Sequence, residues 1–220
     1  MILAVLAGAA IGGIVSKAAP VPVSKDHLAR PGGKARAIVV NSGCANACTG
    51  DQGMADAARM AADVATALGC DPSEVLVAST GVIGVNLKMD RVSSGIQGTV
   101  AALARGKGSE TARAIMTTDP FPKEYAVTVQ TARGSFTVGG TAKGSGMIEP
   151  NMATMLGFLT TDARVSPALL DRALRESGRD TFNAITVDGE CSTNDSLFAL
   201  ASGASGVTVD EELYPALTEA

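Results

Sequence analysis

Histidine and aromatic side chains are scarce in this sequence of 220 residues, which holds one histidine and 3% aromatic residues. A Ser-His-Asp or Cys-His catalytic arrangement would have to use His27, and we interpret its surroundings, Ser24-Lys25-Asp26-His27, as a polar, turn-like stretch. Because the sequence also lacks tryptophan, its hydrophobic core must consist of Val, Leu, Ile, Ala and Met side chains. The length suits one large domain or two small ones.

Basic runs and dense cysteine patterns are absent too. A net charge of −4 without a basic run argues against a nucleic-acid partner. The four cysteines match neither a zinc-binding spacing nor a disulfide scaffold, so we expect reduced thiols in the cytoplasm and no metal site; they are Cys44, Cys48, Cys70 and Cys191. The apolar run 1–16 lacks the positive start of a signal peptide and falls short of the ~20 residues that span a bilayer, so no membrane partner is predicted.

Hydrophobic periodicity and turn residues predict alternating strands and helices. The expected helices are residues 51–68, with an apolar stripe through Met54, Ala57, Ala58, Ala61, Ala62 and Ala65, then 89–105, 167–177 and 196–202. Gly69 and Ser166 are the expected helix caps. The expected strands are residues 35–41, 75–78, 125–131, 135–138, 152–159 and 182–187.

The most informative stretch is residues 139–162, GGTAKGSGMIEPNMATMLGFLTTD. Gly144 and Gly146 allow a ligand to approach the main chain, and Pro150 predicts a sharp bend just before an apolar run that contains Thr154. Most threonines in strands only pack. A threonine that chain cleavage makes N-terminal can act as a nucleophile without histidine, because its own α-amine, with a pKa of about 7.7–8.0, serves as the base.

This stretch closely resembles the self-cleaving segment of the ArgJ family, the bifunctional ornithine acetyltransferases/N-acetylglutamate synthases. The resemblance rests on the runs KGSGMI (143–148), PNMATML (150–156) and TTDA (160–163). It implies self-cleavage between Ala153 and Thr154, which divides the chain into an α-chain-like part, residues 1–153, and the start of a β-chain, residues 154–220. It also implies an α/β fold, a layered α-β-β-α sandwich of the ArgJ/DmpA type.

The resemblance assigns roles to individual residues. It makes Thr154 the nucleophile, Thr80 and Gly81 the oxyanion hole, and Thr117 and Lys143 substrate-binding residues together with Thr154. Pro120 departs from the family's Thr-Thr-Asp-Thr run. The loop 188–196 resembles a family loop, but a capped turn explains its polar residues equally well, and we assign it no catalytic role.

The activity that the resemblance implies is transfer of an acetyl group from N-acetylornithine to glutamate through an acetyl-threonine intermediate, in arginine biosynthesis. Such a ping-pong cycle requires no cofactor, although acetyl-CoA could serve as an acetyl donor. The expected assembly is a heterotetramer of two α and two β chains in the cytoplasm.

Both ends of the chain differ from the family. Residues 14–21 match an early family strand that leads into a turn, so the N-terminus looks shortened or atypical. The family continues past residue 220 with a Gly-Glu-Gly-Ala-type loop and a C-terminal Asn and Thr that complete the substrate site. Two alternatives therefore stay open: a self-cleaving aminopeptidase or amidase on the same scaffold, and an inactive fragment.

Overall fold

The computed structural model describes residues 3–7, 18–30, 33–148, 155–190 and 192–220. Along the chain these form β1 (Leu3–Ala7), α1 (Pro20–Leu28), β2 (Ala37–Cys44), α2 (Gly50–Leu68), η1 (Pro72–Glu74), β3 (Val75–Val82), α3 (Met89–Ala101), α4 (Gly108–Ala114), β4 (Lys123–Thr131), β5 (Gly134–Lys143), β6 (Leu156–Thr161), α5 (Pro167–Asp180), η2 (Phe182–Ala184), β7 (Ser196–Ala201) and α6 (Tyr214–Glu219). None of the helices in these ranges is long and apolar enough to cross a membrane.

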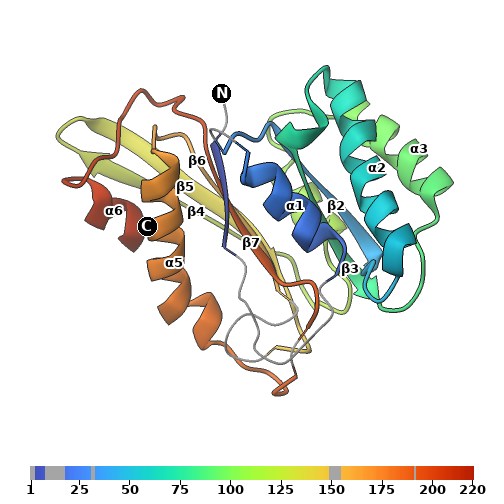
Figure 1. The fold of residues 1–220 in the computed structure, drawn as a ribbon. Helices are drawn as coiled ribbons and strands as arrows, with labels where there is room; N and C mark the ends of the chain where they lie inside the picture. The colour runs from blue at the N-terminus through green and yellow to red at the C-terminus, as the bar shows by residue number, and fades with distance from the viewer. Residues whose placement is uncertain (1–2, 8–17, 31–32, 149–154, 191) are drawn as a thin grey trace.

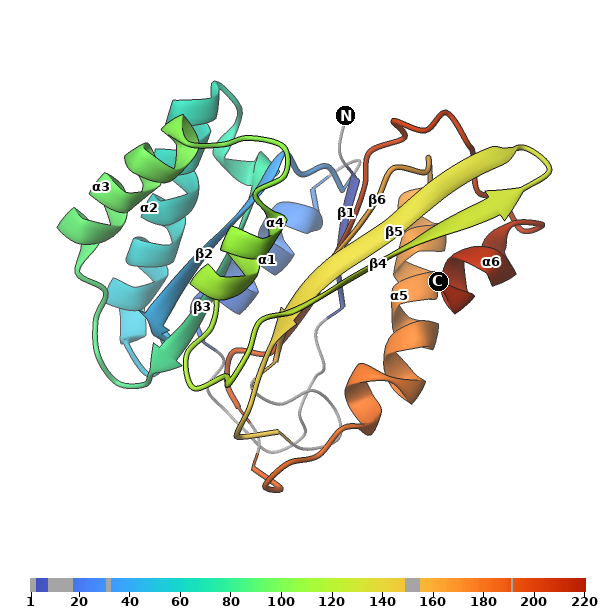
Figure 2. The ribbon, with the colours of Figure 1, turned by 180° about the vertical axis from the view of Figure 1, so that it is seen from behind.

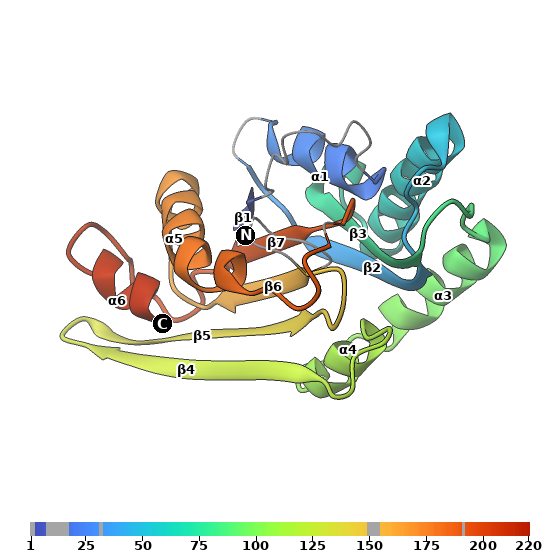
Figure 3. The same ribbon diagram turned by 90° about the horizontal axis from the view of Figure 1, so that it is seen from below.

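The strands form two sheets. The larger sheet has five strands in the order β1-β7-β6-β5-β4, and the smaller one pairs β2 with β3 (Figure 3). The β2–β3 and β6–β7 pairs are parallel, whereas β4–β5, β5–β6 and β1–β7 are antiparallel. A parallel pair needs a crossover connection, which α2 supplies for β2–β3 and α5 for β6–β7.

Period-two alternation along the strands builds the layers. Along β3, Val75 and Val77 face the core shared with α2 and α3, while Leu76 and Ala78 belong to the core between the sheets. Along β7, Phe198 also belongs to that middle core, and its neighbours on either side face α5. Helices therefore cover the two outer faces of two packed sheets, with α2 and α3 on one side and α5 and α6 on the other (Figure 1). This is the α-β-β-α sandwich predicted from the sequence. The expectation of a core without aromatic side chains is wrong, because Phe136 and Phe198 are both fully buried.

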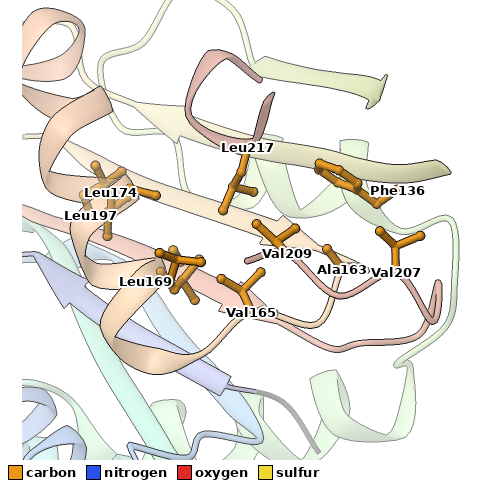
Figure 4. Close-up of a cluster of buried hydrophobic side chains, with 13 residues drawn as sticks. Phe136, Ala163, Val165, Leu169, Leu174, Leu197, Val207, Val209 and Leu217 are labelled. Carbon is orange, nitrogen blue, oxygen red and sulfur yellow. The ribbon is translucent and has the colours of Figure 1, made fainter. Parts of the chain in front are cut away.

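The core beneath α5 and α6 joins apolar side chains from distant parts of the chain. Leu169 and Leu174 of α5, Leu197 of β7 and Leu217 of α6 point toward one another over the larger sheet (Figure 4). Helix α5 begins where expected, because the Ser166 hydroxyl accepts a hydrogen bond from the Leu169 N–H at 3.3 Å. The cap and this apolar face together fix α5 on the sheet.

Most of the expected elements are present with shifted ends. The helices expected at 51–68, 89–105 and 167–177 are α2, α3 and α5; the strands expected at 35–41 and 75–78 are β2 and β3; and the strands expected at 125–131 and 135–138 form the hairpin β4–β5. Gly69 caps α2 with a φ of +66°. The expected stripe on α2 is wrong in part, because Met54 is 39% exposed whereas Met60 and Val64 are buried. The strand expected at 152–159 is described only from residue 155, and β6 begins at Leu156.

Two elements near the C-terminus were predicted wrongly. Residues 182–187 were expected as a strand but hold the short 3₁₀ helix η2, and residues 196–202 were expected as a helix but form β7. The run Ser196–Ala201 is almost entirely buried between β1 and β6. A short apolar run of this kind does not distinguish a buried strand from a buried helix by periodicity.

The N-terminal region also differs from the prediction. The strand expected at 14–21 lies partly outside the described residues, and from Pro20 the chain is the helix α1, which includes the stretch 24–27 expected as a turn. The polar side chains of α1 bind the backbone of β3: the Ser24 hydroxyl donates to the Val77 carbonyl at 2.8 Å, and His27 Nδ1 lies 2.8 Å from the Val75 carbonyl oxygen. His27 thus has a structural partner.

Candidate active site

Several strand ends meet at one place in the fold. β5 ends at Lys143, which pairs with Leu156 at the start of β6, and Leu156 pairs with Ser196 at the start of β7. Because β6 runs antiparallel to β5 and parallel to β7, the starts of β6 and β7 lie beside the end of β5. Figure 2 shows the hairpin β4–β5 in front, beside the smaller sheet whose strand β3 contains Thr80 and Gly81 near its end.

Lys143 joins two of the predicted site residues. Its Nζ donates hydrogen bonds to Thr80 Oγ1 and to Thr117 Oγ1, both at 2.9 Å. Lys143 is 2% exposed. A hydroxyl oxygen that accepts a hydrogen bond from an ammonium group must direct its own O–H elsewhere. Lys143 therefore orients the Thr80 and Thr117 hydroxyls as donors to any further group in the site.

The Lys143 ammonium lacks a paired carboxylate among the described residues, where none of the ion pairs includes it. Burial lowers the pKa of Lys143 below its usual value; the field of Asp119 opposes this shift, Lys123 adds to it, and Asp195 opposes it. A buried cation without a bonded anion is costly, and a bound carboxylate or a developing oxyanion would relieve that cost. The site is thus suited to an anionic group.

Gly81 occupies a position that only glycine fits. Its φ is +131°, and a Cβ there would lie 2.3 Å from the Gly43 carbonyl carbon of the neighbouring strand. The two backbones approach this closely where β2 and β3 end, at the irregular pairing of Cys44. This close approach fixes the backbone next to Thr80, whose side chain is 3% exposed.

Asp195 lies beside the residue that follows Thr154 in the sequence. Its Oδ1 accepts a hydrogen bond from the Met155 N–H at 2.7 Å, whereas Oδ2 is buried and has no hydrogen-bond partner within the described ranges. Burial raises the pKa of Asp195 to about 8, against the opposing effects of the Met155 N–H and Lys143. The carboxyl group is therefore protonated over much of the neutral range.

Side-chain hydrogen bonds hold in place the loop before β7, residues 188–190 and 192–195, and the segment 144–148 after β5. The Asn194 amide donates to the carbonyl oxygens of Ala45 and Ser79, which ties the loop before β7 to the smaller sheet. The Asp188 carboxylate accepts from the N–H groups of Met147 and Ile148 at 2.6 and 2.9 Å. Met147 has a φ of +55°, a left-handed conformation that is uncommon outside glycine and often marks functional segments.

The structure brings together Thr80, Thr117 and Lys143, with Gly81 adjacent in the chain, as far as the predicted site is described. Ala153 and Thr154 lie outside the described residues. Sequence reasoning missed Asp119 and Asp195. Both are buried carboxylates that accept hydrogen bonds from backbone N–H groups 25 and 40 residues away in the chain, Gly144 and Met155 respectively. Two sequence signals were available: Asp195, in the loop 188–196, lies just before an apolar run, and Asp119 belongs to the Thr-Thr-Asp run that contains Thr117.

The raised pKa of Asp195 predicts a pH-dependent gain in stability for Asp195→Asn. Between about pH 4 and pH 8 the folded state keeps a proton that the unfolded state has lost, so the wild-type free energy of unfolding falls as pH rises. The asparagine variant lacks this loss. The free energy of unfolding of Asp195→Asn, relative to that of its parent, should therefore increase by on the order of 1 kcal/mol per pH unit from pH 5 to pH 8 and then level off.

The measurement is urea unfolding at each pH, in a Thr154→Ala background that keeps both proteins uncut. Glu176→Gln, at an exposed position on α5, is the control and should show no comparable trend. A difference between Asp195→Asn and its parent that stays constant from pH 5 to pH 9 would contradict the shifted pKa.

Known proteins resemble this chain in sequence and in structure. The "Arginine biosynthesis bifunctional protein ArgJ" of Symbiobacterium thermophilum is 56% identical over 190 residues, which cover 86% of this chain and 47% of the relative. The protein of the same name from Chlorobium chlorochromatii is 55% identical over 201 residues, 90% of this chain and 47% of the relative. The chain thus spans about half the length of the curated relatives it matches.

Two crystal structures share the fold. The arginine biosynthesis bifunctional protein argJ of Bacillus halodurans matches with a TM-score of 0.57 and 40% identity, over 68% of this chain and 78% of that one. An ornithine acetyltransferase of Mycobacterium tuberculosis, in complex with ornithine, matches with a TM-score of 0.58 and 42% identity, over 66% of this chain and 77% of that one. Residues 7–220 match the sequence model of the ArgJ family, and the chain therefore belongs to that family.

Proposed function

We propose that this chain carries the nucleophile and the oxyanion hole of an ornithine acetyltransferase, which moves an acetyl group from N-acetylornithine to glutamate in arginine biosynthesis. The observation that carries the proposal is the buried Lys143 ammonium, bonded at 2.9 Å to both the Thr80 and the Thr117 hydroxyls. Lys143 thus contacts two other residues that were assigned to the site from sequence motifs. The names of the relatives, and the ornithine bound to one structural neighbour, support the same substrate class.

In the proposed reaction, the Thr154 hydroxyl attacks the acetyl carbonyl carbon of N-acetylornithine, and the α-amine that cleavage frees on Thr154 takes the hydroxyl proton. The Thr80 hydroxyl, which Lys143 orients, and the Gly81 N–H donate to the resulting oxyanion. The C–N bond then breaks and ornithine leaves with the proton. Glutamate's amine attacks the acetyl-threonine in the reverse sequence and leaves as N-acetylglutamate.

The charge of the site suits these substrates. N-acetylornithine and glutamate both carry an α-carboxylate, and the Lys143 ammonium, together with the Thr117 hydroxyl, offers donors to such a group. A lysine serves here as a compact point charge that needs no planar, bidentate geometry. The heterotetramer, the cytoplasmic location and the use of acetyl-CoA as a second acetyl donor stay predictions.

The test is a mass-spectrometric assay of the purified protein with N-acetylornithine and ¹⁵N-glutamate. Equal amounts of ornithine and ¹⁵N-labelled N-acetylglutamate are expected, and neither should form with Thr154→Ala. Acetyl-CoA in place of N-acetylornithine tests the second donor. Release of free acetate without labelled product would contradict the transferase and indicate a hydrolase, and no turnover at all would contradict both.

A further inference from the structure

The Asp119 carboxylate is a buried junction between the two segments that carry Thr117 and Lys143. Its Oδ1 accepts from the Gly144 N–H at 2.7 Å, and its Oδ2 accepts from the Thr117 N–H at 3.3 Å. Gly144 directly follows Lys143 in the chain. The Asp119 side chain therefore binds the backbone of Thr117 and that of the residue next to Lys143. It is itself 0% exposed.

Lys123, at the start of β4, completes this junction. Its Nζ lies 2.6 Å from Asp119 Oδ1 and its side chain is 34% exposed, so the pair reaches from the interior to the surface. Burial by itself would raise the pKa of Asp119, but the hydrogen bonds from Lys123, Gly144 and Thr117 outweigh it and hold the pKa below its usual value. Asp119 is thus a fixed negative charge.

We propose that Asp119 is a positioning residue for the acetyl-transfer site: it sets where the Lys143 ammonium and Thr117 stand relative to each other, and its negative charge favours that ammonium. The inference rests on the proposed function for its catalytic consequence only. The contacts that carry it join described residues, and they exist whether or not the chain transfers acetyl groups.

The charges around Lys143 make the inference testable by the direction in which the pKa of Lys143 shifts. Within the described residues, three ionisable groups act on the ammonium: Asp119 in the segment before β4, Lys123 on β4 and, before β7, Asp195, which carries its charge only at higher pH. Asp119 favours the charged form of Lys143, and Lys123 disfavours it. Removing the first charge and removing the second should therefore shift the titration of Lys143 in opposite directions. Loss of packing alone would give no such opposition.

The experiment compares wild type with Asp119→Asn and Lys123→Met. Lysine labelled with ¹³C at Cε is titrated by NMR, and the Lys143 resonance is identified by its absence in Lys143→Met. We expect the midpoint to fall by about one pH unit or more in Asp119→Asn and to rise by a smaller amount in Lys123→Met. Midpoints that stay unchanged, or that move in the same direction in both variants, would overturn the inference.

Kinetics supply the second readout. Asp119→Asn keeps an oxygen acceptor for one backbone donor but loses the charge, so kcat/KM should fall on the order of tenfold to a hundredfold, and the basic limb of its pH profile should move to lower pH. Lys123→Met should move that limb to higher pH. If the wild type transfers no acetyl group while the NMR midpoints shift as expected, the proposed function fails and the positioning role stands.

Discussion

Thr154→Ala should reduce acetyl transfer from N-acetylornithine to glutamate by at least on the order of 10³-fold, because the proposed acyl-accepting hydroxyl, and its proposed position at a new N-terminus, are lost. The same change should leave the chain uncut at Ala153–Thr154. The measurement is the initial rate of N-acetylglutamate formation under conditions in which the wild type completes many turnovers.

Thr154→Ser is the matched control for this prediction. Serine keeps both a hydroxyl group and, after cleavage, an α-amine on the same residue, so it should restore cleavage and measurable transfer. Transfer by Thr154→Ala at more than a tenth of the wild-type rate would show that another group accepts the acetyl. Loss of activity in the serine variant alone would leave Thr154 as the nucleophile and indicate a role for its methyl group.

Lys143→Met should separate activity from stability. The ammonium donates to both Thr80 and Thr117, and its removal takes away a charge suited to a carboxylate and the group that orients the hydroxyl of the proposed oxyanion hole. Losing one oxyanion-hole donor costs on the order of 10²–10³ in rate. We expect a loss of that size in kcat/KM for N-acetylornithine.

The stability of this variant should change in the opposite sense. Lys143 is 2% exposed, and a methionine of similar length removes a buried charge that no described carboxylate pairs with. The free energy of unfolding should therefore rise by about 1–3 kcal/mol, measured by urea denaturation at pH 7 in the Thr154→Ala background.

Lys107→Met is the control, since Lys107 is half-exposed and pairs with Glu110 on α4. It should change neither turnover nor stability by much. A large fall in the stability of Lys143→Met would mean that the lysine holds the fold together, which contradicts the expectation that its buried, unpaired charge lowers the stability of the fold.

Local patterns predicted the elements whose signals lie within one segment. The apolar spacing of α2 and α5, the cap residue Ser166 and the hairpin around residues 132–134 all act over a few positions. β7 was predicted wrongly because one of its faces is buried against α5 and the other against the smaller sheet, which the run SLFALA does not encode. Helix α1 begins at Pro20, and proline is favoured at the first position of a helix. The resemblance to an early family strand nevertheless predicted a strand here.

The candidate site, too, was predicted only in part from local sequence patterns. Thr80, Gly81, Thr117 and Lys143 were predicted from motifs, and the structure adds that Lys143 donates hydrogen bonds to Thr80 and Thr117. Asp119 and Asp195 could not be found, because their partners are backbone N–H groups that carry no sequence signature. Aspartate usually lies at the surface. These two aspartates become buried hydrogen-bond acceptors only because the fold places β5, β6 and β7 side by side.

The central claim is that this chain builds a self-processing threonine site, and the intact mass of the purified protein tests it most directly. The claim predicts two fragments that meet at Ala153–Thr154, whose masses sum to that of the uncut chain plus one water, and a single uncut mass for Thr154→Ala. A single uncut mass for the wild type after prolonged incubation at neutral pH would contradict it.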